Sequence, residues 1–445
     1  MRSDRHVPVA IIGGGFSGTI LAAQLARRGI SSALVEGSGR VGRGVAYSTR
    51  EPAHLLNVRA EGMSAWSGDP GHFAARFQAE GGDAGGFAER RFFAAYLQDI
   101  LDEAVASGKA EVVEAFATSA RRRDGGWLVQ LEDGGSVEAD ALVLAIGNQD
   151  PEPLGALAAA GDRYIANPWG GEAQAAVKDL TAASGSALLV GTGLTMVDIA
   201  LSLDSAGYRG RAVALSRRGQ VPRSHADFDP APVEYDEVQP RTVRGLWRWL
   251  RRRSAEVGWR AAVDSLRPHS HALWQSLDAE QQRRFLRHAR PYWDVHRHRI
   301  APEVAQTIAR LVAEGRLEII AGRIVASERH GDELQVTIRK RGASMPQTMR
   351  FDYSFNCTGP LHSIARTRDP LLRSLLDAGQ VRPDHLGIGL EVDQRSRTAP
   401  GERLWALGPL TKGRYWEIIA VPDIREQAAA VAEDIAQELS HEPAV

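Results

Sequence analysis

The sequence predicts an α/β protein with two Rossmann-like domains, because the pattern of a buried strand, a glycine turn, a helix and a second strand occurs twice. The first copy begins with the apolar run 7–12 and the second with the run 187–190, and each run leads directly into glycines. Each copy also closes with an apolar strand that ends in a glycine turn, at 141–147 and at 355–359. These positions place the second fold inside the first.

The expected domain boundaries follow from this nesting. Residues 1–165 and 360–445 form the first domain, and residues 166–359 form the second. Within the second domain, residues 227–300 do not fit a plain nucleotide fold, because a Pro-, Asp- and Glu-rich loop precedes a Trp- and Arg-rich helical region. We interpret this segment as an inserted helical cap whose tryptophans pack on the body while its arginines stay in solvent. A helix that binds a membrane surface or nucleic acid is the alternative.

The bulk composition excludes several classes of protein. A chain of 445 residues is too long for one core, and its formal net charge of -1 argues against a general nucleic-acid binder. The single cysteine, Cys357, rules out an intrachain disulfide or a CxxC redox pair and favours a reducing compartment. The longest apolar stretch, 187–203, contains Asp198 and is shorter than the roughly 20 residues of a membrane span. Because no secretory signal is expected either, we expect a cytoplasmic protein without a membrane span.

The first glycine turn has the spacing of a dinucleotide site. Gly13 allows the tight turn, Gly15 lets the backbone approach a pyrophosphate, and Gly18 lets the helix and the strand pack closely. The pyrophosphate would lie at the helix N-terminus, where free N–H groups and the helix dipole favour anions. Glu36, at the end of the second strand, can accept hydrogen bonds from ribose hydroxyls and would repel a 2′-phosphate. FAD or NAD fits this site, and NADP does not.

The second glycine turn predicts a different nucleotide. It keeps Gly191 and Gly193 but has Met196 where the third glycine would stand. Ser216-Arg217-Arg218 follow its second strand, at the position where the first fold carries Glu36. Arginine with a hydroxyl group there can hold a 2′-phosphate through charge-assisted hydrogen bonds, so NADPH is expected in preference to NADH. A solvated arginine pair at a strand end is the alternative.

Further motifs carry a resemblance to a known family. They include Gly42-Arg43-Gly44-Val45-Ala46-Tyr47, His54-Leu55-Leu56-Asn57, Trp293-Asp294-Val295-His296-Arg297-His298-Arg299 and Trp416-Glu417-Ile418-Ile419-Ala420-Val421-Pro422. Through almost the whole chain, such motifs resemble the bacterial FAD/NAD(P)-binding protein family, which is distantly similar to the flavin-dependent N-hydroxylating monooxygenases. The resemblance implies that residues 47–64 line the isoalloxazine side of the FAD site, with Asn57 near the ring. It also implies a helix from about residue 422 that points its N-terminus at the flavin pyrimidine, although Pro409 stands where many relatives carry an aspartate.

The expected site residues combine both turns with the segments that the resemblance adds. The cofactor-binding residues are Gly13, Gly15, Phe16, Ser17, Gly18, Glu36, Tyr47, Leu56, Asn57, Met63, Ser64, Ala117, Gly147, Gly191, Gly193, Leu194, Thr195, Ser216, Arg217, Arg218, Thr358, Gly359 and Gly408. Asn57 and His54 are the catalytic candidates, with a structural histidine as the alternative for His54. Arg297 and Arg299 are candidates for binding a substrate carboxylate, with a structural ion pair as the alternative. No metal site is expected, because the two His-x-His patterns lack acidic or cysteine ligands with a recognised spacing.

FAD beside NADPH predicts an oxidoreductase in which the protein orients the cofactors and excludes water. The resemblance favours a flavin monooxygenase in which a peroxyflavin hydroxylates a small substrate, such as an amine or an amino acid. The expected partners are therefore that small molecule and O₂. Two alternatives stay open: a reductase or dehydrogenase that passes electrons from NADPH to an organic acceptor, and a protein that holds FAD and NADPH without turnover.

Overall fold

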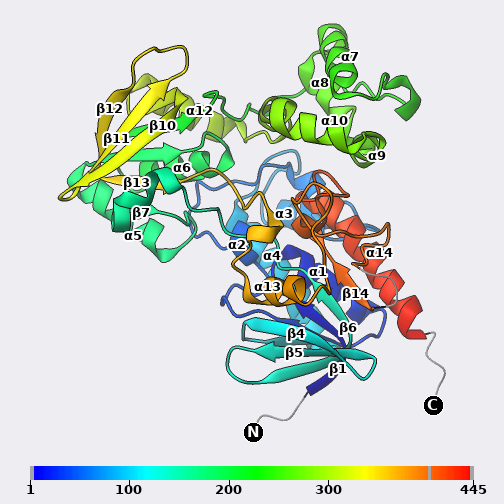
Figure 1. The fold of residues 1–445 in the computed structure, drawn as a ribbon. Helices are drawn as coiled ribbons and strands as arrows, with labels where there is room; N and C mark the ends of the chain where they lie inside the picture. Colours follow the sequence, from blue (N-terminus) through cyan, green and yellow to red (C-terminus); the bar gives the residue numbers. More distant parts are fainter. Residues whose placement is uncertain (1–4, 399–401, 441–445) are drawn as a thin grey trace.

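The computed structural model describes residues 5–398 and 402–440. It has three parts, which Figure 1 separates clearly: a lower lobe that contains the N-terminal sheet, an upper left lobe that contains a second sheet, and a helical cap at the upper right. The cap stands above the lower lobe and beside the upper left lobe. The C-terminal helix returns to the lower lobe, so the chain leaves this lobe for the second one and comes back.

The first sheet is built from both ends of the chain. Its strands are β1 (Arg5–Ile12), β2 (Ser32–Val35), β3 (Ala110–Val113), β4 (Ala117–Arg123), β5 (Gly126–Leu131), β6 (Ser136–Leu144) and β14 (Leu404–Ala406). Strands β3, β2, β1 and β6 pair in parallel in that order, and β14 extends the parallel set along the carboxyl half of β6. Strands β5 and β4 continue from the amino half of β6 as an antiparallel meander. Because β1 is central, the turn that follows it opens at the carboxyl edge of the sheet, where such folds bind nucleotides.

Helices and loops cover both faces of the first sheet. The helices are α1 (Phe16–Arg27), α2 (Gly44–Tyr47), α3 (His72–Ala79), α4 (Arg90–Ala106), α13 (Pro370–Asp377) and α14 (Val421–Ser440), with 3₁₀ turns at Ala60–Gly62, Ile364–Arg366 and Gly408–Thr411. Helices α1, α4 and α14 share one buried core, in which Ile20, Leu97 and Val431 meet the apolar side chains of β1. Helix α13 packs into a second core, where Leu372 lies with Trp127 of the meander.

The second sheet repeats the parallel order of the first. Its strands are β7 (Tyr164–Ile165), β8 (Ser186–Val190), β9 (Arg211–Ser216), β10 (Leu317–His330), β11 (Glu333–Lys340), β12 (Gln347–Phe351) and β13 (Tyr353–Asn356). Strands β10, β9, β8, β13 and β7 are parallel in that order, as β3, β2, β1, β6 and β14 are in the first sheet. Helices α5 (Gly171–Ala183), α6 (Leu194–Ser205) and α12 (Pro302–Ala313) form one core with this sheet. The two sheets therefore confirm the predicted pair of Rossmann-like folds, one nested in the other.

The predicted boundary at residue 165 is wrong by about ten residues. The 3₁₀ segment Gly155–Arg163 buries Leu157 and Ala160 against the second sheet, and β7 pairs with β13. Residues 155–165 therefore belong to the second domain, and the first connection between the domains runs through residues 147–154.

The segment 227–300 forms the helical cap. It consists of α7 (Val243–Val257), α8 (Trp259–Asp264), α9 (Ser270–Ser276), α10 (Ala279–Arg284) and α11 (Arg290–Arg297), with 3₁₀ turns at Tyr235–Glu237 and Arg267–His269 and a π-helical turn at Phe285–Ala289. Its small core contains Trp249 and Leu273, while Arg248 and Arg252 of α7 are exposed. Trp249 thus packs within the cap itself and not on the body of the protein, whereas these arginines stay in solvent as expected.

A buried ion pair joins the two nucleotide domains. Arg90, the first residue of α4, donates two hydrogen bonds of 2.9 Å to the carboxylate of Asp198 on α6. The side chains of Arg90 and Asp198 are only 11% and 7% exposed. The carbonyl oxygen of Asp198 also lies 3.0 Å from Nε2 of His54. Because α6 begins at the second glycine turn, these contacts fix the position of that turn relative to the first domain.

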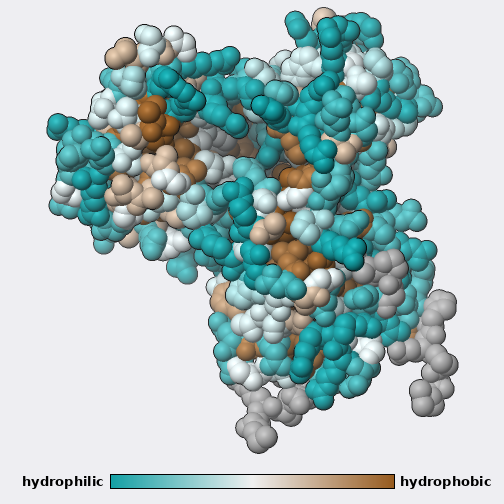
Figure 2. Space-filling model, in the orientation of Figure 1, coloured by the Kyte–Doolittle hydropathy of each residue, from teal (hydrophilic) through white to brown (hydrophobic). Residues whose placement is uncertain are grey.

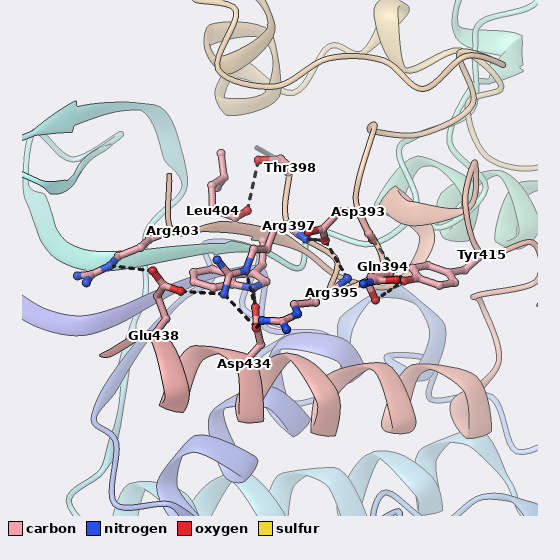
Figure 3. A network of polar contacts seen from close by, with 11 residues as sticks. Asp393, Gln394, Arg395, Arg397, Thr398, Arg403, Leu404, Tyr415, Asp434 and Glu438 are labelled. Atoms are coloured by element: carbon pink, nitrogen blue, oxygen red, sulfur yellow. Dashed lines mark hydrogen bonds and ion pairs between the residues drawn. The ribbon is translucent and has the colours of Figure 1, made fainter. Parts of the chain in front are cut away.

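Helix α14 is anchored to the loop that precedes β14 (Figure 3). Arg397 donates to both oxygens of Asp434, at 2.6 and 3.0 Å, and to Glu438 at 2.8 Å. The indole N–H of Trp405 donates to the same carboxylate of Asp434 at 2.9 Å. Nearby, the hydroxyl of Tyr415 donates to the Gln394 carbonyl at 2.8 Å. These charge-assisted contacts hold α14, and with it the loop at its N-terminus, against the first sheet.

The visible surface is mostly hydrophilic (Figure 2). On this face, apolar side chains gather where the cap meets the lower lobe and on the lobe of the second sheet. Within residues 5–398 and 402–440, no helix is long and apolar enough to cross a membrane.

Removal of the Asp198 carboxylate should destabilise the protein strongly. In the Asp198→Ala variant, Arg90 stays buried without a counter-charge, so we expect the free energy of unfolding to fall by about 3 to 5 kcal/mol. Chemical denaturation followed by circular dichroism measures this change. The exposed pair of Arg350 and Glu333 is the control, and Glu333→Ala should leave the midpoint unchanged. Equal midpoints for Asp198→Ala and the wild type would contradict a joining role for the ion pair.

Candidate functional site

The first glycine turn is packed as tightly as its spacing predicts. Gly13 has a φ of +106°, and a Cβ atom there would lie 2.5 Å from the carbonyl oxygen of Ala145 on the neighbouring strand. A Cβ atom on Gly18 would lie 1.9 Å from the carbonyl oxygen of Gly13. By contrast, a Cβ atom on Gly15 would meet only the Cα atom of Gly44, at 3.6 Å. Gly13 and Gly18 are therefore required by the fold itself, whereas Gly15 leaves its outer side open for a ligand.

The N-terminus of α1 is open to an anion. No side chain caps this helix, and its N-cap residue, Gly15, has an extended conformation. Each oxygen of the half-buried Glu36 accepts one backbone N–H, from Gly14 at 2.8 Å and from Ser38 at 2.7 Å. A carboxylate can accept about four hydrogen bonds, so Glu36 keeps acceptor capacity for ribose hydroxyls. The open helix N-terminus and the acceptor capacity of Glu36 thus have the chemistry that a diphosphate and a ribose require.

The second glycine turn repeats the geometry of the first. Gly191 has a φ of +123°, and a Cβ atom there would lie 2.0 Å from the Cys357 carbonyl oxygen. Gly193 is the N-cap of α6, has no side-chain cap, and has open space around its Cβ position. Met196 replaces the third glycine and is fully buried. At this position a side chain therefore lies between the helix and the strand. Leu194 and Thr195 form the first turn of α6.

The strand register places Ser216 at the position of Glu36. Ile12 pairs with Val35 in the first sheet, and Val190 pairs with Leu215 in the second. The Ser216 hydroxyl is already used inside the loop, because it accepts the Gly219 N–H at 2.9 Å and bonds the Thr192 hydroxyl at 2.8 Å.

Two arginines follow Ser216 without an acidic partner. Arg217 is exposed and Arg218 is half-buried. Among the residues that the structure describes, neither guanidinium forms an ion pair with a carboxylate. No acidic residue therefore competes with a phosphate for these two positive charges.

The segment that the resemblance assigns to the flavin divides into core and accessible residues. Leu56, Met63 and Ser64 are buried in the first core, and the half-buried Tyr47 packs its ring edge-on against Phe93. Asn57 is half-buried, and its side-chain amide has no hydrogen-bond partner among the described residues. Its backbone carbonyl lies 3.0 Å from Nε2 of His225. The Asn57 amide is therefore a half-buried polar group in this segment with no hydrogen-bond partner among the described residues.

His54 has the environment of a structural residue. It is 4% exposed; Nδ1 lies 2.8 Å from the Thr49 hydroxyl, and Nε2 lies 3.0 Å from the Asp198 carbonyl. Burial lowers the pKa of His54, although the nearby Asp198 carboxylate opposes the shift. Both ring nitrogens are already bonded, so the geometry assigns His54 to holding the domains together rather than to proton transfer with a substrate.

The two arginines predicted for a substrate carboxylate have carboxylate partners within the protein. Arg297 donates to Glu417 at 2.8 Å, and their side chains are 11% and 4% exposed. Arg299 is 4% exposed, donates to the His296 carbonyl at 3.0 Å, and lies 3.8 Å from the Asp264 carboxylate. The structural ion pair, which was the alternative interpretation, therefore describes both arginines in this structure.

The cap docks on the loop that leads into α14, in the first domain. The Trp274 indole donates to the Gly413 carbonyl at 2.9 Å and stacks on Trp416, with ring centroids 5.0 Å apart. Glu417 has a φ of +73°, and its buried carboxylate accepts from Trp293 as well as Arg297. Burial raises the pKa of Glu417, but the Arg297 guanidinium and the His298 ring outweigh it, so the pKa lies below its usual value. The motif 293–299 thus binds the first domain through Glu417.

The predicted residue Gly147 lies at the first connection between the domains. A cavity of about 490 Å³ lies there and is lined by Asn148, Gln149, Leu361 and Arg366, among others. A smaller pocket next to it is lined by Gly147, Pro409 and Lys412. Burial lowers the pKa of Lys412 to about 8, and the Arg290 guanidinium adds to the effect. Lys412 thus places a titratable group beside Pro409 in this pocket.

Four further predicted residues stand at or just beyond strand ends. Gly408, with a φ of +62°, packs so close to α1 that a Cβ atom would lie 2.8 Å from the Ser17 hydroxyl. Thr358 donates to the Asn356 side chain at 2.7 Å, and Gly359 follows with a φ of +87°. The buried Ala117 begins β4, next to Phe116, whose ring covers Gly37.

Sequence reasoning missed the residues that join the parts of the molecule. Arg90, His225, Tyr292 and Glu417 each bond or stack across a domain or cap boundary. The only sequence signal for any of them is that Tyr292 and Glu417 lie in or beside two aromatic-rich motifs. Their partners are far away along the chain, so no local pattern marks them.

Two nested Rossmann-like domains, each with an open glycine turn, define the class of FAD- and NAD(P)-binding flavoproteins. Residues 10–149 match the family model described as FAD-NAD(P)-binding. A search of curated proteins finds no match.

Solved structures share this fold over nearly the whole chain. One is the ornithine N-hydroxylase of Kutzneria sp. 744, solved with reduced FAD, NADP⁺ and L-ornithine, at 17% identity and a TM-score of 0.68, covering 98% of this chain and 100% of that one. The L-lysine 6-monooxygenase of Pseudomonas syringae has 18% identity and a TM-score of 0.68, covering 97% and 99%. The thioredoxin reductase of T. acidophilum has 13% identity and a TM-score of 0.56, covering 98% and 100%. At these identities, the likeness establishes the fold.

Alanine at Gly15 or at Gly193 should weaken the binding of one nucleotide and leave the binding of the other unchanged. Gly15→Ala and Gly193→Ala both fit the protein without a clash, so both variants should fold. A methyl group in a backbone-to-diphosphate contact costs about 1–3 kcal/mol, so each variant should bind its nucleotide about 5- to 160-fold more weakly. Gly15→Ala should lose FAD, measured as visible flavin absorbance per protein. Gly193→Ala should keep FAD and lose NADPH affinity. Gly68→Ala, at an exposed and open glycine, is the control, and flavin retention in Gly15→Ala would reject this FAD site.

Acidification should remove the stability that the buried, neutral His225 ring contributes to the folded protein. Burial lowers the pKa of His225 from 6.5 to about 4, so the folded protein keeps this ring neutral while the unfolded chain takes up a proton near pH 6.5. The contribution of His225 to stability is therefore complete above pH 6.5 and declines as the pH falls toward 4. Unfolding free energies at pH 7.5 and about pH 5 should differ less in His225→Gln than in the wild type. The same pH dependence in both proteins would contradict the assignment.

Proposed function

We propose that this chain is an FAD-dependent oxidoreductase that takes hydride from NADPH and hydroxylates the nitrogen of a small amine or amino acid. The proposal depends mainly on one observation. The two nested domains carry side chains of opposite charge at equivalent strand ends, next to their glycine turns. The first domain presents Glu36 at the end of its second strand, and the second domain presents Arg217 and Arg218. One fold therefore suits FAD and the other suits a nucleotide with a 2′-phosphate.

Bound FAD supplies the redox chemistry, and the chain supplies orientation and exclusion of water. The open N-terminus of α1 would hold the diphosphate, and Glu36 the ribose. The Asn57 amide, which has both a donor and an acceptor free, would hold the polar edge of a ring at the domain interface. The cap, fixed by Glu417 to the loop before α14, would cover this interface and keep water out.

The thiol content argues against a disulfide reductase, although the fold of thioredoxin reductase is similar. Cys357 is the only cysteine in the sequence, is 3% exposed, and has a pKa raised by burial. A dithiol relay requires two reactive sulfurs beside the flavin, and this chain has one inert thiol.

The likeness to the amine hydroxylases favours a monooxygenase over a reductase. The ornithine and lysine enzymes match this chain with higher TM-scores than thioredoxin reductase does, at similar coverage. In the proposed reaction, NADPH supplies the hydride and O₂ supplies two oxygen atoms. One atom is inserted into an N–H bond of the substrate, and the other leaves as water. A reductase that passes electrons to an organic acceptor is the second candidate.

Anaerobic mixing followed by admission of air tests the proposal. NADPH should bleach the flavin of the purified holoenzyme faster than NADH does. When air is admitted with L-ornithine, L-lysine or other small primary amines, NADPH consumption should match the hydroxylated amine, with little hydrogen peroxide.

Other outcomes separate the alternatives. Rapid bleaching with abundant peroxide and no hydroxylated amine would overturn the monooxygenase assignment and support the reductase. A flavin that NADPH does not bleach would overturn both and support a protein that binds the nucleotides without turnover.

A further inference from the structure

The cap reaches the second nucleotide site through one aromatic side chain. Tyr292 lies on α11, and the Cζ atom of Arg218 lies 5.0 Å from the centroid of its ring. Arg218 stands two residues beyond the end of β9, in the second domain, whereas Tyr292 belongs to the cap. This stack is therefore a contact between two separately built parts of the molecule.

The Tyr292 ring also contacts another aromatic side chain of the cap. Trp247 of α7 packs edge-on against Tyr292, with ring centroids 5.7 Å apart. The next residue of α11, Trp293, donates its indole N–H to Glu417, and Arg297 binds the same carboxylate at 2.8 Å. Helix α11 is thus held on the first domain by its neighbouring residues while Tyr292 faces the second domain.

The contact with the Tyr292 ring restricts the conformations of the Arg218 side chain before an anion binds. A solvated arginine samples many rotamers, and binding must restrict them. An aromatic ring beside the guanidinium attracts the cation and restricts its movement, while N–H groups that point away from the ring stay free for a phosphate. Arg217, the neighbouring arginine, is exposed and has no such support among the described residues.

We propose that Tyr292 is a positioning residue that selects NADPH, because its ring holds the Arg218 guanidinium in place for the 2′-phosphate. This inference rests on the proposed binding of NADPH to the second domain. It assigns part of the coenzyme selectivity to the cap, which lies outside the Rossmann-like fold itself. The Tyr292 hydroxyl is not required, because the stack uses only the ring.

Calorimetric titration of the holoenzyme with 2′,5′-ADP and with 5′-AMP isolates the contribution of the 2′-phosphate, without any turnover. The wild type should bind 2′,5′-ADP more tightly. Tyr292→Ala should reduce this preference about fivefold, the size of a partly exposed cation–π contact, and leave the affinity for 5′-AMP unchanged. Tyr292→Phe keeps the ring and should retain the full preference.

Tyr235→Ala is the matched control, because Tyr235 is another cap tyrosine under an arginine, Arg241, at 3.9 Å. It should retain the full preference. An equal loss of affinity for both ligands in Tyr292→Ala would indicate a merely structural role and overturn the inference. A loss of preference in Tyr292→Phe would overturn it too, because the hydroxyl would then be the group that matters.

Arg218→Ala separates this inference from the proposed function. If the wild type shows no preference for 2′,5′-ADP, the NADPH assignment falls and the inference falls with it. If Arg218→Ala abolishes the preference and Tyr292→Ala retains it, the NADPH assignment stands and only the role of Tyr292 is overturned.

Discussion

The arrangement of the molecule depends on the buried ion pair between Arg90 and Asp198. Each nucleotide domain has its own apolar core, and its strands form their hydrogen bonds within its own sheet. What neither core determines is the orientation of one glycine turn toward the other. A buried charge pair is favourable only when both partners are in place with good geometry, so it selects one orientation and penalises others. His54 and His225 add hydrogen bonds across the same boundary, and they remain neutral because burial lowers their pKa values.

Features that arise from local chemistry could be predicted from the sequence. The expected strand 7–12 lies within β1, and the expected strand 187–190 lies within β8. Gly13 and Gly191 were assigned to tight turns, and both have positive φ angles with a neighbouring carbonyl where a Cβ atom would be. The boundary at 165 failed because β7 is only two residues long and is defined by pairing with β13, about 190 positions further on.

The site itself was only partly predictable for the same reason. The charge of Arg297 is visible in the sequence, but its partner Glu417 lies 120 positions away. From the sequence alone, an internal ion pair could be named as an alternative to a substrate carboxylate for Arg297, but nothing in the sequence decides between the two. For His54, the decisive partner is the backbone carbonyl of Asp198, a group that every residue carries. The open side of Gly15 and the free amide of Asn57 follow from packing around them, which composition does not encode.

The burial of Cys357 has a practical consequence for studies of motion. This thiol is the only one in the chain and is buried in the core of the second domain. Maleimide dyes should therefore leave the wild-type protein almost unlabelled. Cysteines introduced at exposed positions of the cap and of the second lobe can then carry a donor and an acceptor fluorophore without removal of any native residue. Single-molecule energy transfer on such a pair would report directly whether the lobes rotate against each other when nucleotide is added.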